Sequence, residues 1–351
     1  MKIILDAMGG DLAPEAPVLG AIEAAKLYNA EITLVGRGAE ILEVLKKHGI
    51  ETLPTGLEIA HADDVVDMHD DPGKVIHKRK NSSMIIGLRM LAEGQGDAFV
   101  SAGSTGALLS GATLIVKRVK GIRRASMAPA MPTKAGHKVV ICDCGANAEC
   151  TPEFLLQFGL VASAYAKKTY GTENPRVGLL NIGTEDSKGG QLQKDAYALL
   201  KQAGDQGLIN FTGNVEARDV PLGGADVVVC DGFSGNVLIK TIEGTAMYMG
   251  SLMKHRIFKR KHKLFKYEPL PLLGALLCKK GVDEVVGMLN PDTIGGTQFL
   301  GIKKPVIKAH GSSGVTAFRN AVRQAMDASK CDCTEQLAQD LARLKEMGAN
   351  D

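Results

Sequence analysis

The feature that most constrains the fold of this chain is a repeated alternation between short apolar runs and segments of helical length. Eight runs of four residues are mostly apolar along their whole length, and Gly, Asn or Asp bounds most of them. Such runs are typical of strands in a parallel sheet covered by helices on both faces. The pattern predicts the α/β class, as a three-layer α/β/α sandwich with a largely parallel sheet. The expected strands are 3–6, 32–35, 98–101, 139–142, 177–180, 208–211, 227–230 and 306–309.

The segments between these strands have the length and composition of helices. No internal repeat or low-complexity linker marks a boundary between domains. The sequence therefore predicts one α/β/α catalytic domain over residues 1–330, with an inserted basic and apolar helical segment at 246–290. A helical tail is expected over residues 331–351. The expected helices of the main domain are 16–28, 39–48, 82–92, 106–117, 152–169, 192–203, 236–249 and 315–329.

Composition narrows the class of protein. The 351 residues are 45% hydrophobic and 23% charged, which suits a folded core, and the net charge is only +3. Together with an aromatic content of 4%, this small charge argues against a nucleic-acid partner. Asp6 interrupts the first apolar run, so a signal peptide is not expected, and no apolar run is long enough to span a membrane. Seven cysteines without paired spacing suit a reducing, cytoplasmic location.

Six of the expected strands run directly into loops of Gly, Ser, Thr, Asn and Asp. In a parallel sheet these loops lie at the carboxyl edge, where ligands bind. Glycine lets the backbone approach a phosphate, and hydroxyls and helix N-termini donate hydrogen bonds to it. One such loop is ordinary turn chemistry, but six in one chain favour a phosphate site. The candidate phosphate-binding residues are Asp6, Gly9, Gly10, Ser104, Thr105, Gly106, Asn147, Asn181, Gly232, Gly311, Ser312 and Ser313.

Three polar residues in these loops are candidates for a chemical role. Lys188 lies in a glycine-flanked loop after a buried strand, where an ammonium suits a phosphate or a developing oxyanion. Asp231 follows a valine-rich strand directly, and its alternative role is to cap a helix or to form a turn. His310 ends another strand beside Gly-Ser-Ser, and both a structural and a ligand-binding role stay open.

The usual cofactor and metal motifs are missing. The Walker A pattern does not occur, and two partial dinucleotide fingerprints lack their third glycine. Cys142, Cys144 and Cys150 have no second ligand pair, so neither a metal nor a cofactor is expected. A catalytic Cys144 is possible by position, but a buried structural cysteine is the favoured interpretation.

The inserted segment carries a separate signal. Residues 254–266 hold seven Lys or Arg and no acid, and residues 270–277 are strongly apolar. A solvated charged helix is the default interpretation of such a run. Basic residues beside an apolar stretch also suit an acidic protein partner or an anionic membrane surface. The sequence leaves these alternatives open.

Taken together, the loops resemble those of the bacterial phosphate acyltransferase family (acyl-ACP:phosphate acyltransferase) of phospholipid synthesis. The resemblance rests on six motifs in the family's order: Asp6-Ala-Met-Gly-Gly-Asp11, Ser101-Ala-Gly-Ser-Thr-Gly106, Gly145-Ala-Asn147, Asn181-Ile-Gly-Thr-Glu-Asp-Ser-Lys188-Gly, Asp231-Gly-Phe-Ser-Gly-Asn236 and His310-Gly-Ser-Ser313. It implies a fold like isocitrate and isopropylmalate dehydrogenases without their redox chemistry. It also implies a homodimer with peripheral membrane association, and a downstream glycerol-3-phosphate acyltransferase as a further candidate partner.

The reaction implied by the resemblance moves a fatty acyl group from acyl carrier protein to inorganic phosphate. Because phosphate is itself a nucleophile, no Ser or Cys nucleophile is required, and direct transfer is favoured over an acyl-enzyme. Lys188 would pair with the phosphate or the oxyanion, Asn181 and Asn236 would orient the substrates, and Asp231 would fix Lys188 or accept a proton. Two alternatives are a short-chain acyl-CoA:phosphate acyltransferase and a non-catalytic module that binds anions and membranes.

Overall fold

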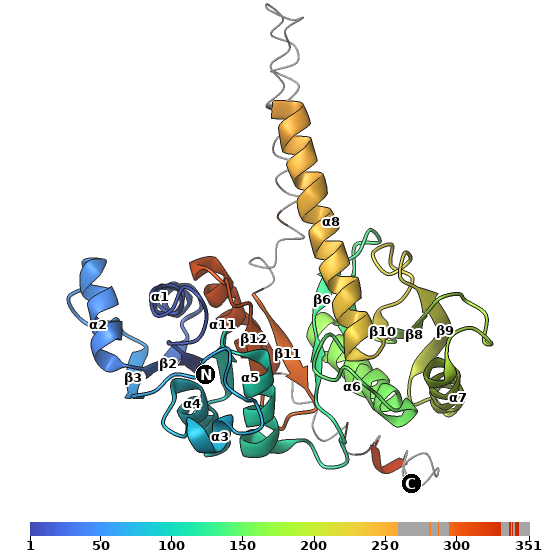
Figure 1. The fold of residues 1–351 in the computed structure, drawn as a ribbon, viewed down its shortest axis with the longest axis horizontal. Coiled ribbons are helices and arrows are strands. Elements are labelled where there is room, and N and C mark those ends of the chain that lie inside the picture. The colour runs from blue at the N-terminus through green and yellow to red at the C-terminus, as the bar shows by residue number, and fades with distance from the viewer. Residues whose placement is uncertain are drawn as a thin grey trace, which may run out of the picture.

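The chain forms two β-sheets side by side, with helices packed against both and one long helix projecting from the body (Figure 1). The computed structural model describes residues 1–258, 281, 287, 295–330, 337, 339 and 341–343. Most strands in both sheets are parallel, so the expected α/β class is confirmed. Within the described residues, no helix is long and apolar enough to cross a membrane.

The first sheet has seven strands, and its first five are parallel. The next strand, β11, runs antiparallel to both of its neighbours. Phe99 and the apolar residues of β1 are fully buried, as expected for strands covered on both faces. In order across the sheet the strands are β3 (Leu57–His61), β2 (Glu31–Gly36), β1 (Lys2–Asp6), β4 (Ala98–Ser101), β12 (Val306–Ala309), β11 (Gly296–Leu300) and β5 (Ser126–Ala128).

The second sheet has five strands, and only its edge strand β6 is antiparallel. It has a core of its own, in which Val177, Val227 and Val229 pack beneath helix residues such as Leu156 and Phe158. In order the strands are β6 (Ala130–Pro132), β7 (Lys138–Cys142), β10 (Val227–Val229), β8 (Arg176–Asn181) and β9 (Asn210–Glu216).

The helices cover the sheets as the alternating pattern requires. On one face of the first sheet, Gly20 lets two helices approach closely, because a Cβ there would lie 2.5 Å from the Cβ of Phe318. These helices are α1 (Glu15–Tyr28) and α11 (Val315–Lys330). The others are α2 (Gly38–Lys47), α3 (Val75–Lys78), α4 (Ser83–Ala92), α5 (Thr105–Gly111), the π-helix η1 (Ala112–Lys117), α6 (Pro152–Tyr170), α7 (Gln191–Asp205) and α8 (Gly232–Phe258).

The division into two sheets differs from the single sheet drawn from the sequence. The chain changes sheets at Pro129, which alone separates β5 in the first sheet from β6 in the second. The sequence of a uniformly apolar strand does not indicate which sheet the strand joins, and strands of three residues are too short to show a hydrophobic pattern. The strands β3, β5, β6 and β11 were therefore not predicted.

The predicted insert and tail are only partly described. The insert was expected to begin at residue 246, but α8 runs without a break from Gly232 to Phe258. Most of the remaining insert, and most of the tail over 331–351, lies outside the described residues. The single domain over 1–330 stays a prediction.

Two glycines on α8 give matched predictions about stability. A Cβ at Gly235 would lie 1.9 Å from the Asp143 carbonyl oxygen, whereas a Cβ at Gly244 would meet nothing within 4 Å. Gly235→Ala is expected to lower the free energy of unfolding by about 3 kcal/mol or more, because backbone must move. Gly244→Ala is expected to raise it by about 0.4–1 kcal/mol. Chemical denaturation of both variants checks this; equal stability would contradict the close approach at Gly235.

Candidate functional site

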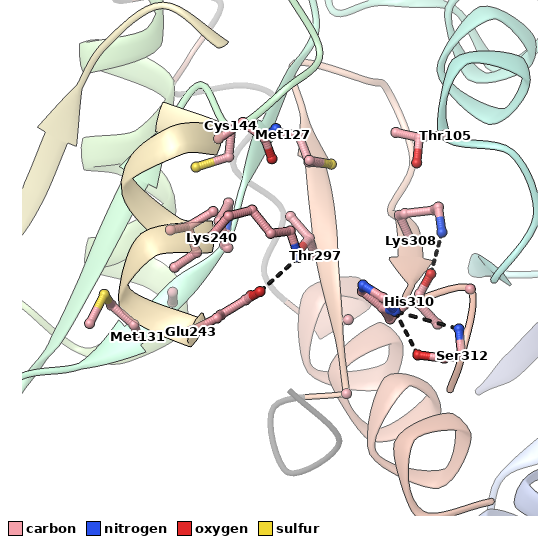
Figure 2. A pocket seen from close by; sticks show the side chains of 18 of the residues that line it. Thr105, Met127, Met131, Cys144, Lys240, Glu243, Thr297, Lys308, His310 and Ser312 are labelled. Carbon is pink, nitrogen blue, oxygen red and sulfur yellow. Dashed lines mark hydrogen bonds and ion pairs between the residues drawn. The ribbon is translucent and has the colours of Figure 1, made fainter. Parts of the chain in front are cut away.

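The six polar loops are shared equally between the two sheets. Three follow β1, β4 and β12 in the first sheet, and three follow β7, β8 and β10 in the second. A cavity of about 460 Å³ is lined by residues from both groups and from α8 (Figure 2). Of the predicted site residues, Thr105, Asn236, His310, Gly311 and Ser312 line it.

The first-sheet side of the cavity is shaped by a buried carboxyl group. Asp6 accepts a 2.7 Å hydrogen bond from the Ser101 hydroxyl and a 3.1 Å bond from the Met8 amide, so it joins the loops after β1 and β4. Burial raises the pKa of Asp6. A Cβ at Gly9 would lie 2.7 Å from an oxygen of Asp6, so a residue larger than glycine would clash at this position. Asp6 and Gly9 therefore hold the loops in place and do not themselves line the cavity.

His310 and Ser312 form a polar pair on the loop after β12. The Ser312 amide donates to Nδ1 of His310 at 3.4 Å, and the Ser312 hydroxyl lies 2.9 Å from the same nitrogen. Because an amide can only donate, Nδ1 is an acceptor and the ring proton is on Nε2. Both side chains are exposed at the cavity, where His310 can donate Nε2–H to a ligand (Figure 2). Ser313 is buried behind them.

Two lysines that were not predicted line the same cavity. Lys308 lies near the end of β12, and burial lowers its pKa to about 8. Lys240 lies on α8, one turn after Asn236, and pairs with Glu243 at 2.7 Å. The signal for Lys308 was present in the sequence, because a cation interrupts the apolar run Val306–Ala309. Lys240 carried no such signal, because a lysine on a helix is ordinary.

The apolar part of the wall comes from α8 and from the segment that connects the two sheets. Met127, Pro129 and Met131 contribute from the connecting segment, and Ile239 and Ile242 contribute from α8. The cavity therefore combines polar and apolar groups: Thr105, Lys308, His310 and Ser312 lie on the first-sheet side, and Lys240 and Glu243 lie on the α8 side near Met131 (Figure 2). The full lining also includes Asp11, Met68, Ala130, Pro132, Cys144, Glu243, Gly295, Gly296, Thr297 and Ala309.

Asp231 and Asn147 anchor the first turn of α8. Asp231 accepts hydrogen bonds from the Ser234 amide at 2.8 Å and from the Ser234 hydroxyl at 2.7 Å, which is N-cap geometry. The Asn147 carbonyl accepts the Gly232 amide at 2.7 Å, and its side-chain amide donates to Asp143 at 2.9 Å. None of these residues lines the cavity, so the capping alternative for Asp231 has direct support.

Asp231 gives a prediction that separates capping from charge. Asn is as good an N-cap as Asp, so Asp231→Asn is expected to keep the wild-type free energy of unfolding to within about 0.5 kcal/mol. Asp231→Ala is expected to lower it by about 0.5–2 kcal/mol. Both variants are expected to retain turnover. Loss of turnover in a stable Asp231→Asn variant would instead show that the carboxylate takes part in catalysis.

Lys188 lies on the loop after β8, beyond the lining of the cavity. Its side chain is exposed and lies 3.8 Å from Glu185, and its carbonyl accepts a 3.1 Å bond from the Asn181 side chain. Asn181 therefore orders this loop. Ser104, Gly106 and Gly10 also lie in the polar loops without lining the cavity. The catalytic role of Lys188 stays a prediction.

The described cysteines near the cavity are mostly buried. Cys144 lines the cavity, but burial raises the pKa of its thiol well above the usual range, which disfavours the thiolate. Burial also raises the pKa of Cys142. Among the described residues, no group of three or more His, Cys, Asp or Glu side chains could hold a metal ion.

The chain matches a known protein family over nearly its whole length. A model of the family described as fatty acid synthesis protein matches residues 1–336. The chain belongs to this family. A phosphate acyltransferase from Thermoanaerobacterium thermosaccharolyticum is 41% identical to it over 341 residues, which cover 97% of each chain. The predicted family resemblance is therefore confirmed.

Solved structures show the fold alone, because their sequences are distant. A phosphotransacetylase from Streptococcus pyogenes matches with a TM-score of 0.60 and 19% identity, and the match covers 94% of each chain. A structure assigned as a 4-hydroxythreonine-4-phosphate dehydrogenase from Salmonella typhimurium matches with a TM-score of 0.54 and 13% identity, covering 93% of this chain and 99% of that one. The expected dehydrogenase-like α/β fold is confirmed.

Proposed function

We propose that this protein transfers a fatty acyl group from an acyl carrier protein thioester to inorganic phosphate, forming an acyl phosphate for phosphatidic acid and phospholipid synthesis. The observation that carries the proposal is the combined polar and apolar lining of one cavity. Its lining offers hydroxyls, an imidazole and two ammonium groups from the first sheet and α8, and hydrocarbon from α8 and the segment that connects the two sheets. An enzyme joining a fatty acyl group to phosphate needs both environments in one place. Family membership and the phosphate acyltransferase relatives support the same reaction.

The polar lining residues are suited to hold phosphate as the nucleophile. Lys240 supplies a cation from α8, while Thr105, Ser312 and Nε2–H of His310 supply donors from the first sheet. Donors fixed at these positions place a phosphate oxygen against the thioester carbonyl and stabilise the tetrahedral oxyanion. Attack forms the new C–O bond, and collapse breaks the C–S bond. No covalent intermediate on the protein is needed.

The apolar part of the wall is suited to the acyl chain. Ile239, Ile242, Met127 and Met131 all line this part of the wall and belong to one apolar cluster, and all four are partly or fully buried. Methionine adapts to the shape of a flexible hydrocarbon chain. Burying each methylene contributes about 0.8 kcal/mol, so a long acyl chain gains binding energy here that an acetyl group does not. This favours a fatty acyl donor over a short-chain one.

The donor is tested by following free thiol release with two carriers. Palmitoyl carrier protein and palmitoyl-CoA are each incubated with enzyme and phosphate, and with sulfate in place of phosphate as the control. Phosphate-dependent release that is faster from the carrier protein is the expected result. Faster release from CoA would favour the acyl-CoA alternative. Absence of release from both would favour the non-catalytic anion-binding module.

We also propose that the protein is a cytoplasmic homodimer that contacts anionic membranes. The outer part of α8 supports the membrane contact, because Met247 is 74% and Tyr248 64% exposed, with Met249 and Leu252 also exposed. Figure 1 shows this part of the helix projecting away from the sheets. In the sequence it leads into the basic run 254–266. Exposed apolar residues beside cations suit a lipid surface, and co-sedimentation with anionic vesicles tests this.

A further inference from the structure

Lys308 is held in an unusual place for a cation. Its neighbours Val306, Ile307 and Ala309 on β12 are fully buried, and β12 lies inside the sheet between β4 and β11. The Lys308 side chain is half-buried and lines the cavity (Figure 2). Its Nζ donates to the carbonyl of Ala102 at 3.3 Å and to that of Ala309. The ammonium is therefore fixed at the edge of the sheet that faces the proposed substrates.

The charges around Lys308 come from three elements. Asp11, on the loop after β1, favours the ammonium, while Lys240 on α8 opposes it. Glu243 pairs with Lys240, and His310 is the first residue after β12, the strand that carries Lys308. Among the described residues, Lys308 itself makes no ion pair within 4 Å. It has carbonyl partners and no carboxylate bound to it, which leaves its proton available.

We infer that Lys308 is the general acid of the proposed acyl transfer, donating a proton from Nζ to the departing thiolate. The inference rests on the proposed function and deepens it. The acidity matches the task, because burial lowers the pKa of Lys308 to about 8, and an alkyl thiol has a pKa of about 8.5. A general acid works best when its pKa lies near the working pH. Lysines with ordinary pKa values are much weaker acids.

The proton balance closes within the cavity. The dianion HPO₄²⁻ attacks the carbonyl carbon, the C–S bond breaks with its electron pair moving to sulfur, and Lys308 gives that sulfur a proton. The amine left behind takes the proton of the phosphate hydroxyl in the acyl hydrogen phosphate. Thiol and acyl phosphate dianion leave, and the ammonium is restored without any other reactant.

Two other cavity residues are less suited to this step. Lys240 is half-exposed and bound to Glu243, which suits it to hold an anion rather than to release a proton. His310 accepts the Ser312 amide at Nδ1 and presents Nε2–H at the cavity, an arrangement that suits it to bind an anion. Lys308 thus combines burial, position and a free proton.

The first test is the pH profile with palmitoyl carrier protein as donor. Wild-type kcat/KM is expected to fall as pH rises through about 8, because Lys308 must be protonated. Lys308→Arg keeps the charge but cannot release a proton in this range, so a rate about 10²–10⁴-fold lower, without the fall near pH 8, is expected. Lys303→Met, on the exposed turn before β12, is the control and is expected to match wild type.

The second test varies the leaving group. Lys308→Met is compared with wild type on octanoyl thioesters of an alkyl thiol and of a more acidic aryl thiol. The variant is expected to lose activity on the alkyl thioester and to recover to within a few-fold of wild type on the aryl thioester. A structural role would lower both rates by one factor. Equal losses on both donors, or a Lys308→Arg profile that keeps the fall near pH 8, would overturn the inference.

These outcomes are distinguishable from failure of the proposed function. If wild type releases no thiol from any donor in the presence of phosphate, acyl transfer itself is refuted. If wild type is active and phosphate-dependent, but Lys308→Met loses the same factor on both thioesters or Lys308→Arg keeps the fall near pH 8, only the role of Lys308 as general acid is refuted. Thermal unfolding of Lys308→Arg and Lys308→Met shows whether either variant is misfolded. If Lys308→Met is misfolded, Lys308→Gln replaces it in the leaving-group test.

Discussion

Replacing Lys240 with methionine is expected to lower kcat/KM for phosphate about 10²–10³-fold, the usual effect of removing one fixed electrostatic donor from an active site. Methionine keeps the apolar stem of lysine, so the packing of α8 is retained. Lys240 is one of two lysines that line the described cavity, and its Nζ is free to exchange Glu243 for a phosphate oxygen. Initial rates at varied phosphate concentration measure the effect.

The matched control for Lys240 is Lys201→Met on α7, an exposed lysine outside the cavity lining. It is expected to leave kcat/KM within a factor of two. The Lys240 variant is expected to unfold at the wild-type temperature, because an exposed ion pair contributes little to stability. An unchanged KM for phosphate in Lys240→Met would place the phosphate elsewhere, and the loop of Lys188 would then be the next position to examine.

Many of the buried parallel strands could be predicted from the sequence for a simple physical reason. Strands buried on both faces must be apolar throughout, so β4 and β12 were predicted with the bounds that the structure shows. The edge and antiparallel strands β5, β6 and β11 follow no such rule. Pairing with a distant partner, rather than local composition, makes them strands, and the change of sheet at Pro129 left no local signal.

The candidate site was readable only in part, because loop composition shows that a loop is special but not what it does. Turn-forming and ligand-binding loops use the same Gly, Ser and Asp residues, so Asp231 and Asn147 were predicted beside residues that do line the cavity. Both hold α8 in place. Lys240 and Lys308 were missed because a helix and a strand bring them together across the cavity, a proximity that depends on how the two sheets sit.

The apolar wall gives the second large prediction. Ile242→Glu is expected to lower kcat/KM for a palmitoyl donor about 10²-fold and for a butyryl donor less than threefold. A carboxylate in this wall keeps its hydration shell and so displaces part of the acyl chain. Each methylene left in water costs about 0.8 kcal/mol, a factor of about 4, so three or four displaced methylenes account for the loss. Thiol release across a series of chain lengths measures it.

The control for this prediction lies on the same helix. Val237 is 49% exposed and does not line the cavity, so Val237→Glu adds the same charge to α8 outside the wall. It is expected to leave the preference among chain lengths unchanged. Equal losses for palmitoyl and butyryl donors in Ile242→Glu would mean that the new carboxylate repels phosphate rather than the acyl chain. Wild-type rates at every chain length would show that the acyl chain does not bind in this cavity, and would contradict the proposed site.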